Sequence, residues 1–377
     1  MCNENLEILE LLDNEKKIKE FIAKIEKSNL ISIDIEFMRR STFFPEPCVI
    51  QFSNGTTHGC IDLTINIDYK TIFEKIFNRD KTIIIHSCRQ DLEILHMILG
   101  YIPNKIFDTQ FAASFLGYKY QIGYAELISD IFNITVDKSE KMTNWKKRPL
   151  SNEQIKYALN DVIYLNKLHT NLQNKLINSQ KSIYFQEEFK NYLNDIEWNP
   201  KVEDAWSRIK SMNNLSKNVK NAVKAISIWR ERKAINLNLP RNWILSEKDI
   251  IEISKNFSKD KEIYLPPKNK ILDKNKDSDE IKNEIINFSN SSSQMPKKEK
   301  KIKSNSNHKK TADDLYEYYK SISVQNKISY QIVSPKKMIL NYLKNNDKNS
   351  RLINGWRRNL IDINEVKTIT NDYFNGD

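Results

Sequence analysis

Two acidic residues, Asp34 and Glu36, lie two positions apart in the run Leu30-Ile31-Ser32-Ile33-Asp34-Ile35-Glu36-Phe37. Isoleucines alternate with polar residues and no Pro or Gly interrupts the run, so the pattern predicts a β-strand with both carboxylates on one face. At about 3.3 Å per residue, their Cα atoms are about 6–7 Å apart. Because neighbouring carboxylates repel each other most strongly where water is excluded, a divalent cation would stabilise the pair. A solvated strand face that carries two acids without a ligand is the alternative interpretation.

Two later stretches contribute residues of the same chemical kind. The run Thr82-Ile83-Ile84-Ile85-His86 predicts a buried strand, and Asp91 follows it in an early turn of a helix. The run from Gln154 to Leu165 has helical periodicity without a breaker. Tyr157 and Asp161 are four positions apart in this run, so the pattern predicts that they lie on the same face of that helix.

In chain order, the pattern Asp-x-Glu, His-x4-Asp and Tyr-x3-Asp resembles the 3′–5′ exonucleases with four acidic residues and a tyrosine, and the ribonuclease D family most closely. The resemblance covers nearly the whole chain. It includes two further motifs, Phe44-Pro45-x-x-Cys48-Val49-Ile50-Gln51 and Asn144-Trp145-x-x-Arg148-Pro149-Leu150-Ser151. It implies an α/β ribonuclease H-like exonuclease domain, a mixed sheet flanked by helices. It also implies 3′–5′ exoribonuclease activity that trims RNA 3′ ends, with tRNA precursors as substrates.

The same resemblance implies a role for each member of the catalytic set. Asp34, Glu36 and Asp161 would hold one metal ion, and Asp34 would bridge to a second ion that Asp91 supports. Tyr157 has a reference pKa of about 10, too high for a good general base at neutral pH. We therefore expect its hydroxyl to orient the attacking water.

Hydrolysis of a phosphodiester requires a nucleophile, stabilisation of the charge on the phosphate, and an anionic leaving oxygen. Two cations about 3.5–4 Å apart can meet all three requirements. Mg²⁺ prefers oxygen ligands and keeps several waters, so a few carboxylates and the substrate phosphate suffice to bind it. We predict Mg²⁺ as the cofactor, with Mn²⁺ or another divalent ion as the alternative, and nucleoside 5′-monophosphates as products.

A basic and aromatic stretch precedes the predicted Tyr157 helix. It contains Trp145, Lys146, Lys147 and Arg148. Lysine and arginine side chains contact a phosphate backbone, and an indole ring can stack on a base, so we predict that these four residues contact RNA. A solvated loop in which Trp145 packs inward is the alternative.

The predicted elements that position these residues begin with hairpin strands and continue as a β-α-β-α series, which predicts a mixed sheet flanked by helices. Asn54-Gly55 is a strong hairpin-turn signal, and Asp13, Ser87 and Asp108 are candidate helix N-caps. His86 we interpret as a structural hydrogen-bonding group rather than a metal ligand. The expected strands are 31–37, 48–53, 57–62, 82–86 and 106–107, and the expected helices are 14–27, 69–78, 91–99 and 109–116.

From Val202 onward the patterns are purely helical. Three segments resemble the first HRDC domain of ribonuclease D, and Leu352-Ile353-Asn354-Gly355-Trp356-Arg357-Arg358 resembles the end of the second. By the resemblance, such all-α bundles help to bind nucleic acid. A Ser/Asn/Lys-rich stretch between them has the composition of a flexible linker. The predicted domains are the exonuclease domain 1–198, the first HRDC domain 199–290, the linker 291–311 and the second HRDC-like domain 312–377.

The charge is unevenly distributed. Residues 1–200 carry 24 Lys+Arg and 27 Asp+Glu, whereas residues 201–377 carry 36 and 22. The basic second part favours a polyanionic partner, although a general excess of lysine would produce the same balance. We expect RNA as the partner. A DNA 3′–5′ exonuclease on the same fold and a non-catalytic RNA-binding scaffold are the alternatives.

Other classes of protein are disfavoured. The four cysteines lack a C-x-x-C spacing, so they predict neither a zinc site nor a disulfide framework. No signal peptide is indicated, and no apolar run approaches the ~20 residues of a membrane span. No Gly-rich phosphate loop is present among only 7 glycines, which argues against use of ATP. We expect a cytoplasmic monomer.

Overall fold

The computed structural model describes residues 10–77, 80–136, 143–212, 214–292 and 306–374. The chain forms two compact units, each assembled from segments distant in sequence. Unit 1 consists of the segments Met1–Phe37, Pro47–Ile196 and Lys301–Asp377, and unit 2 of Met38–Glu46 and Glu197–Lys300. Among the residues described, none of the helices combines the length and apolar character that a membrane span requires.

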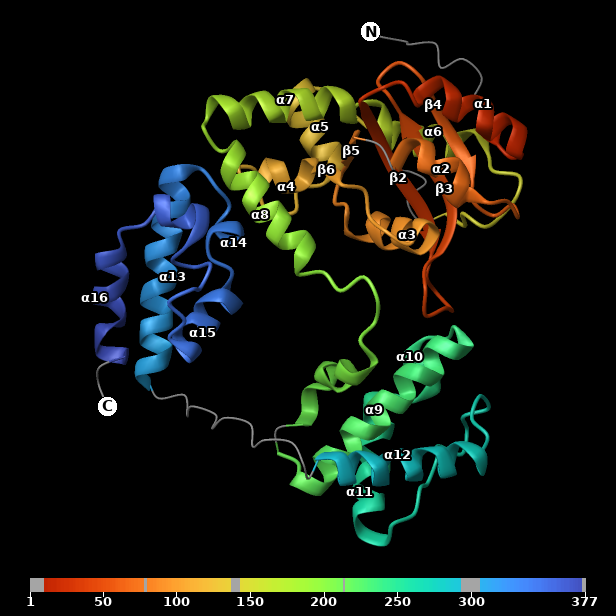
Figure 1. Cartoon of the computed structure of the whole chain (residues 1–377), viewed down its shortest axis with the longest axis vertical. Helices are drawn as coiled ribbons and strands as arrows, with labels where there is room; N and C mark the ends of the chain where they lie inside the picture. Colours follow the sequence, from red (N-terminus) through yellow and green to blue (C-terminus); the bar gives the residue numbers. More distant parts are fainter. Residues whose placement is uncertain (1–9, 78–79, 137–142, 213, 293–305, 375–377) are drawn as a thin grey trace. The chain divides into compact units, whose positions relative to one another are not determined.

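The centre of unit 1 is a mixed sheet, as predicted, but it has six strands among the described residues instead of the five expected (Figure 1). Its strand order is β1-β4-β3-β2-β5-β6. Strands β3 and β4 pair antiparallel across the Asn54-Gly55 turn, whereas β2 with β5, β5 with β6 and β1 with β4 are parallel. The strands are β1 Leu11–Leu12, β2 Leu30–Met38, β3 Glu46–Ser53, β4 His58–Asp62, β5 Thr82–Ile85 and β6 Lys105–Asp108.

Helices cover this sheet. Their apolar faces are buried: α1 turns Ile18, Phe21 and Ile22 inward, for example, and α6 packs on β4. The helices of this part are α1 Glu15–Ile25, α2 Tyr69–Phe77, α3 Arg89–Leu99, α4 Thr109–Ser114, α5 Tyr124–Phe132, α6 Asn152–Ile163, α7 Leu165–Asn178 and α8 Ser182–Asn194.

Two of the three predicted N-caps differ in the structure. Asn14, not Asp13, caps α1, because its side chain accepts a hydrogen bond from the backbone of Lys17. Ser87 has a positive φ of 65° and lies before the actual cap of α3, Cys88. Asp108 caps α4 as predicted, and its carboxylate also accepts hydrogen bonds from the backbone N–H groups of Ser87 and Cys88 at 3.1 and 2.8 Å. The buried carboxylate of Asp108 thus accepts hydrogen bonds from backbone N–H groups at the start of α4 and just before α3.

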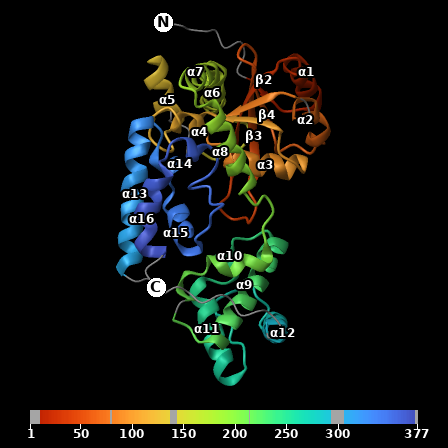
Figure 2. The same ribbon diagram turned by 60° about the vertical axis from the view of Figure 1, so that its left-hand side comes forward.

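The last segment of the chain returns to unit 1 and packs beside α8 (Figure 1, Figure 2). Arg357 is buried there and donates two hydrogen bonds of 2.7 Å to Glu188 on α8. Trp356 donates its indole N–H to the same carboxylate at 2.8 Å, and its ring lies 5.5 Å from that of Phe115. The elements of this segment are α13 Ser306–Asn326, α14 Tyr330–Val333, α15 Lys336–Asn345, η3 Gly355–Asn359 and α16 Ile363–Phe374.

The ion pair of Glu188 with Arg357 predicts a large stability effect. The Arg357 side chain is only 1% exposed, so Glu188→Ala would leave a buried cation without its anion. We expect a loss of about 3–5 kcal/mol in the free energy of unfolding, measured by urea denaturation. Asp195→Ala is the matched control, because the Asp195–Arg351 pair joins the same two segments but is 58% and 43% exposed. The control should cost about 1 kcal/mol or less. Equal losses for the two variants would contradict the assignment.

The described residues of the 197–300 part of unit 2 form helices and no strands, as the sequence predicts. Helix α9 is its centre, and Glu231 on that helix is fully buried, paired through two 2.6 Å hydrogen bonds with Arg241. Phe43, from the segment before β3, joins the apolar core. The elements are η1 Val202–Arg208, η2 Lys210–Met212, α9 Lys217–Leu237, α10 Arg241–Ile244, α11 Glu247–Asp260 and α12 Lys276–Ser292.

The end of α12 and the start of α13 lie within the predicted linker 291–311. Helix α12 continues to Ser292 and α13 begins at Ser306, so both helices extend into that stretch. Residues 293–305 lie outside the described part of the chain. The domain boundaries drawn from the sequence therefore stay predictions.

Candidate active site

Strand β2 and helix α6 bring three carboxylates together. One oxygen from each of Asp34, Glu36 and Asp161 lies within 4.8 Å of the other two. Residues Ile31, Ile33 and Ile35 are buried in the sheet, and this alternation turns the two acids of β2 to the opposite face. The N-terminus of α6 is held by a capping box between Ser151 and Gln154, and Asp161 lies in the third turn of that helix.

The environment penalises negative charge at this cluster. Burial raises the pKa of Asp34 to about 6, opposed by a hydrogen bond from the backbone of Ile35. Three converging oxygen donors in a partly buried site are the chemistry that a hard divalent cation requires. The residues present therefore fit a Mg²⁺-like ion.

Asp91 lies close to this cluster but is not part of the three-oxygen group. It is in the first turn of α3 and is 6% exposed. Burial raises its pKa well above the ordinary value, and the charges of Asp34 and Glu36 raise it further. The structure thus brings all four predicted carboxylates into one electrostatic neighbourhood, with three of them in mutual ligand range.

Tyr157 lies on α6 one turn before Asp161, with which it shares a hydrogen bond. Burial, followed by the negative charge of Asp161, raises the pKa of Tyr157 above its usual range. The hydroxyl is therefore protonated at neutral pH. It can donate or accept a hydrogen bond, but it cannot act as a general base.

The structure corrects the prediction for the basic loop. Trp145 is only 2% exposed and its ring packs 6.0 Å from that of Tyr157, so it offers no face for a base to stack on. Arg148 forms a bidentate ion pair with Asp62, with two hydrogen bonds of 2.6 Å. Lys146 and Lys147 are exposed, and their contact with RNA stays a prediction.

His86 is a structural residue, as interpreted from the sequence. Its Nε2 lies 3.0 Å from the carbonyl oxygen of Ile122, and its Nδ1 lies 2.9 Å from the hydroxyl of Thr109. Burial lowers the pKa of this imidazole. A neutral ring that donates to a carbonyl fixes the chain between α4 and α5 rather than binding metal.

Gln51 is a residue to which the sequence assigned no role. It is fully buried on β3, and neither amide atom has a hydrogen-bond partner among the described residues. It pairs across the sheet with Cys60, whose thiol pKa is raised by burial and then by the charges of Glu36 and Asp34. Paired residues of antiparallel strands share a face, so Gln51 lies on the face of the carboxylates. A polar side chain in a run of buried residues was the signal that could have identified it.

The chain is similar in sequence to known proteins. Residues 9–177 match the family model described as a 3′–5′ exonuclease. Ribonuclease D of Bartonella henselae is 31% identical over 254 residues, which are 67% of this chain and 62% of that protein. Ribonuclease D of Acidiphilium cryptum is 32% identical over 245 residues, 65% of this chain and 62% of that protein. The match thus covers less than two thirds of the length of these relatives.

A solved structure shows the same fold over nearly the whole chain. It is the crystal structure of Escherichia coli RNase D, described as an exoribonuclease involved in structured RNA processing. It superimposes with a TM-score of 0.83 at 22% identity and covers 97% of this chain and 99% of that one. The family model, the sequence relatives and the fold agree: the chain belongs to the ribonuclease D family and carries a 3′–5′ exonuclease domain.

Proposed function

We propose that this protein is a 3′–5′ exoribonuclease that removes nucleoside 5′-monophosphates one at a time from RNA 3′ ends. The observation that carries the proposal is the convergence of Asp34, Glu36 and Asp161 within 4.8 Å, with the Tyr157 hydroxyl beside them. Similarity to ribonuclease D supports RNA as the substrate. Precursors of tRNA are the proposed cellular class, and the cytoplasm is the proposed site of action.

In this proposal, Asp34, Glu36 and Asp161 would hold one Mg²⁺ and Asp91 would support a second. When bound, such ions lower the pKa of water and neutralise charge on the phosphate and the leaving oxygen. With a pKa of about 6, Asp34 is mostly ionised at neutral pH and is ready to act as a ligand. Tyr157 keeps its proton and orients the attacking water through its hydroxyl, while Asp161 positions that hydroxyl.

Product analysis tests the proposal. We expect a 3′-extended tRNA to release 5′-monophosphates in Mg²⁺, and we expect EDTA to stop the release, because the carboxylates alone cannot activate water. Chromatography of the products measures this. A circular RNA of the same sequence is the control and should stay intact.

Internal fragments, cleavage of the circle, or full activity in EDTA would each exclude the mechanism. Matched single-stranded DNA belongs in the same assay. Faster release from DNA than from RNA would favour the DNA exonuclease alternative. No release from either polymer, together with retained RNA binding, would favour the non-catalytic scaffold.

A further inference from the structure

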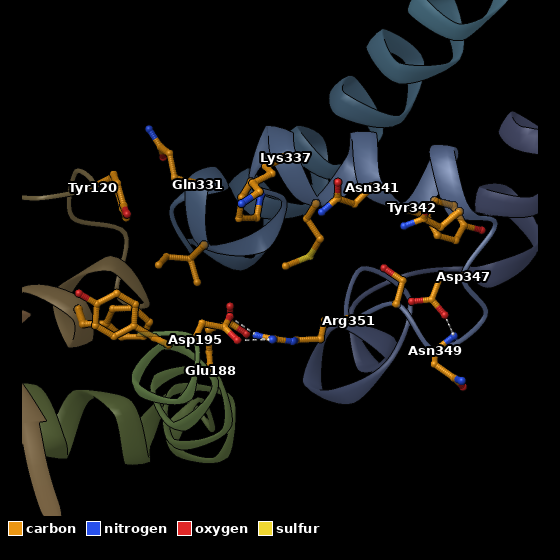
Figure 3. Close-up of a pocket in the computed structure, with 17 residues that line it drawn as sticks. Tyr120, Glu188, Asp195, Gln331, Lys337, Asn341, Tyr342, Asp347, Asn349 and Arg351 are labelled. Atoms are coloured by element: carbon orange, nitrogen blue, oxygen red, sulfur yellow. Dashed lines mark hydrogen bonds and ion pairs between the residues drawn. The ribbon is translucent and has the colours of Figure 1, made fainter. Parts of the chain in front are cut away.

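Unit 1 contains a pocket of about 520 Å³ that is separate from the carboxylate cluster. Figure 3 shows that residues of α4, α8 and the loop after α4 line one side, and that α14, α15 and the following loop line the other. The volume lies in the range of pockets that hold a small organic ligand. The question is which ligand its walls would recognise.

The exonuclease side of the pocket carries three aromatic rings and two carboxylates, Glu188 and Asp195, which are ion-paired with Arg357 and Arg351. Tyr120 is 40% exposed. Tyr192 is half-buried, and its ring lies 5.3 Å from that of Phe111, which holds it in place. A fixed aromatic wall with one ring open to solvent is a stacking surface for a flat ligand.

The other side of the pocket presents polar side chains at regular spacing along α15. Lys337, Asn341 and Asn345 occupy positions i, i+4 and i+8 of α15, all are exposed, and all line the pocket. This spacing forms one stripe along the helix, with a cation followed by two amides. An amide presents a donor and an acceptor side by side, which matches the edge of a nucleobase, and an ammonium group binds phosphate.

The pocket also lies near β6, the edge strand of the sheet whose inner strand β2 carries Asp34 and Glu36. Tyr192 lies within electrostatic range of Cys88, Asp108 and Arg89. Asp108 binds the backbone N–H groups that precede α3, and Asp91 lies in the first turn of that helix. A strand of nucleic acid whose 3′ end reaches the carboxylates can therefore continue toward Tyr192 and the pocket.

We propose that this pocket is a nucleotide-binding subsite, which takes one unstacked nucleotide of the RNA substrate upstream of its 3′ end. The base would stack on Tyr120, Asn341 and Asn345 would hydrogen-bond its edge, and Lys337 would contact a neighbouring phosphate. This assignment rests on the proposed exoribonuclease function. The Asp195–Arg351 ion pair, with contacts of 2.7 and 2.8 Å, connects the two walls at the surface.

The test measures hydrolysis by the full-length protein on single-stranded RNAs of increasing length, from two nucleotides upward. For the parent, KM should fall stepwise at the length that first reaches the pocket. Tyr120→Ala and Asn341→Ala should each remove that step and leave kcat unchanged. For Tyr120→Ala, KM on longer RNA should rise about tenfold, since one stacked base contributes about this much. By this proposal the pocket takes a nucleotide upstream of the 3′ end, so we expect the dinucleotide to be cut equally by all variants.

Two matched controls separate the pocket from general effects. Tyr330→Ala removes a ring of similar exposure, 39%, that does not line the pocket. Lys336→Ala removes the same charge as Lys337→Ala from the adjacent position of α15, outside the pocket lining. Both controls should retain the step. A scan with single abasic nucleotides should then locate one position whose base matters to the parent but not to Tyr120→Ala.

The outcomes separate the subsite from the function on which it rests. If the parent releases no monophosphates, the proposed function fails first. If the parent is active but Tyr120→Ala and Asn341→Ala keep its dependence on RNA length, the subsite is wrong. A uniform response to abasic positions, or an equal effect of Lys336→Ala and Lys337→Ala, would likewise overturn it in favour of diffuse electrostatic binding.

Discussion

Asp34→Asn is expected to reduce turnover by at least about 10³-fold and to leave RNA binding largely intact. The substitution preserves the size of the side chain but removes a negative charge from the three-carboxylate group. Loss of one preorganised electrostatic group commonly costs about 10²–10³-fold, and loss of a metal ligand also weakens the ion. Single-turnover kinetics and a filter-binding titration measure the two effects separately.

The matched control is Asp130→Asn, because Asp130 is an exposed carboxylate on α5 in the same unit. It should retain the parent rate. An Asp34→Asn protein with more than a few per cent of the parent rate would show that the cluster is not the catalytic centre.

The same substitution predicts a change in the pH dependence of stability without metal. The pKa of Asp34 is raised to about 6 in the folded protein, so the folded state favours the protonated carboxyl. This contribution is fully present below pH of about 4 and is lost as the pH rises through about 6. In EDTA, the melting temperature of the parent should therefore fall across this window more than that of Asp34→Asn. A parallel fall in both would contradict the assignment of this pKa.

Tyr157→Phe is expected to lower kcat by about 10²–10⁴-fold while metal affinity remains unchanged. Only a hydroxyl is lost, and the hydroxyl is a partner of Asp161 rather than a member of the three-oxygen group. Steady-state kinetics together with calorimetric titration of Mg²⁺ separate positioning of water from binding of metal.

Tyr264→Phe provides a control of the same chemical kind. Tyr264 also donates its hydroxyl to an aspartate, Asp260 at 3.1 Å, but it is 55% exposed and belongs to unit 2. It should change neither quantity. Equal rates for Tyr157→Phe and the parent would make Tyr157 a packing residue of α6.

The residues that could be placed from the sequence are those whose geometry depends on near neighbours. Alternation places Asp34 and Glu36 on one face of β2, and the helical repeat places Tyr157 one turn before Asp161. Such periodicity is a property of the backbone and needs no knowledge of the fold. That the two local patterns belong to one site was predicted from the family resemblance, not from periodicity.

Contacts between distant segments could not be derived in this way. Arg148 pairs with Asp62, which lies 86 positions earlier in the chain. The basic composition of the loop predicted that Arg148 contacts RNA, but its guanidinium group is used in this intramolecular ion pair. Trp145 likewise looked like a stacking residue because aromatic side chains serve both cores and ligands. Its burial depends on how α6 packs on the sheet, which local pattern does not specify.

The return of the last segment to α8 has a consequence for synthesis on the ribosome. Glu188 and Arg357 are 169 positions apart, and at about 5–20 residues per second roughly 8–34 s separate their synthesis. During this interval Phe115 lacks its Trp356 neighbour, and Glu188 has no cation to neutralise it. The nascent chain therefore presents an incomplete surface that chaperones can bind. Translation that stops between these two codons yields a product with this surface permanently open, which makes it a substrate for proteolytic quality control.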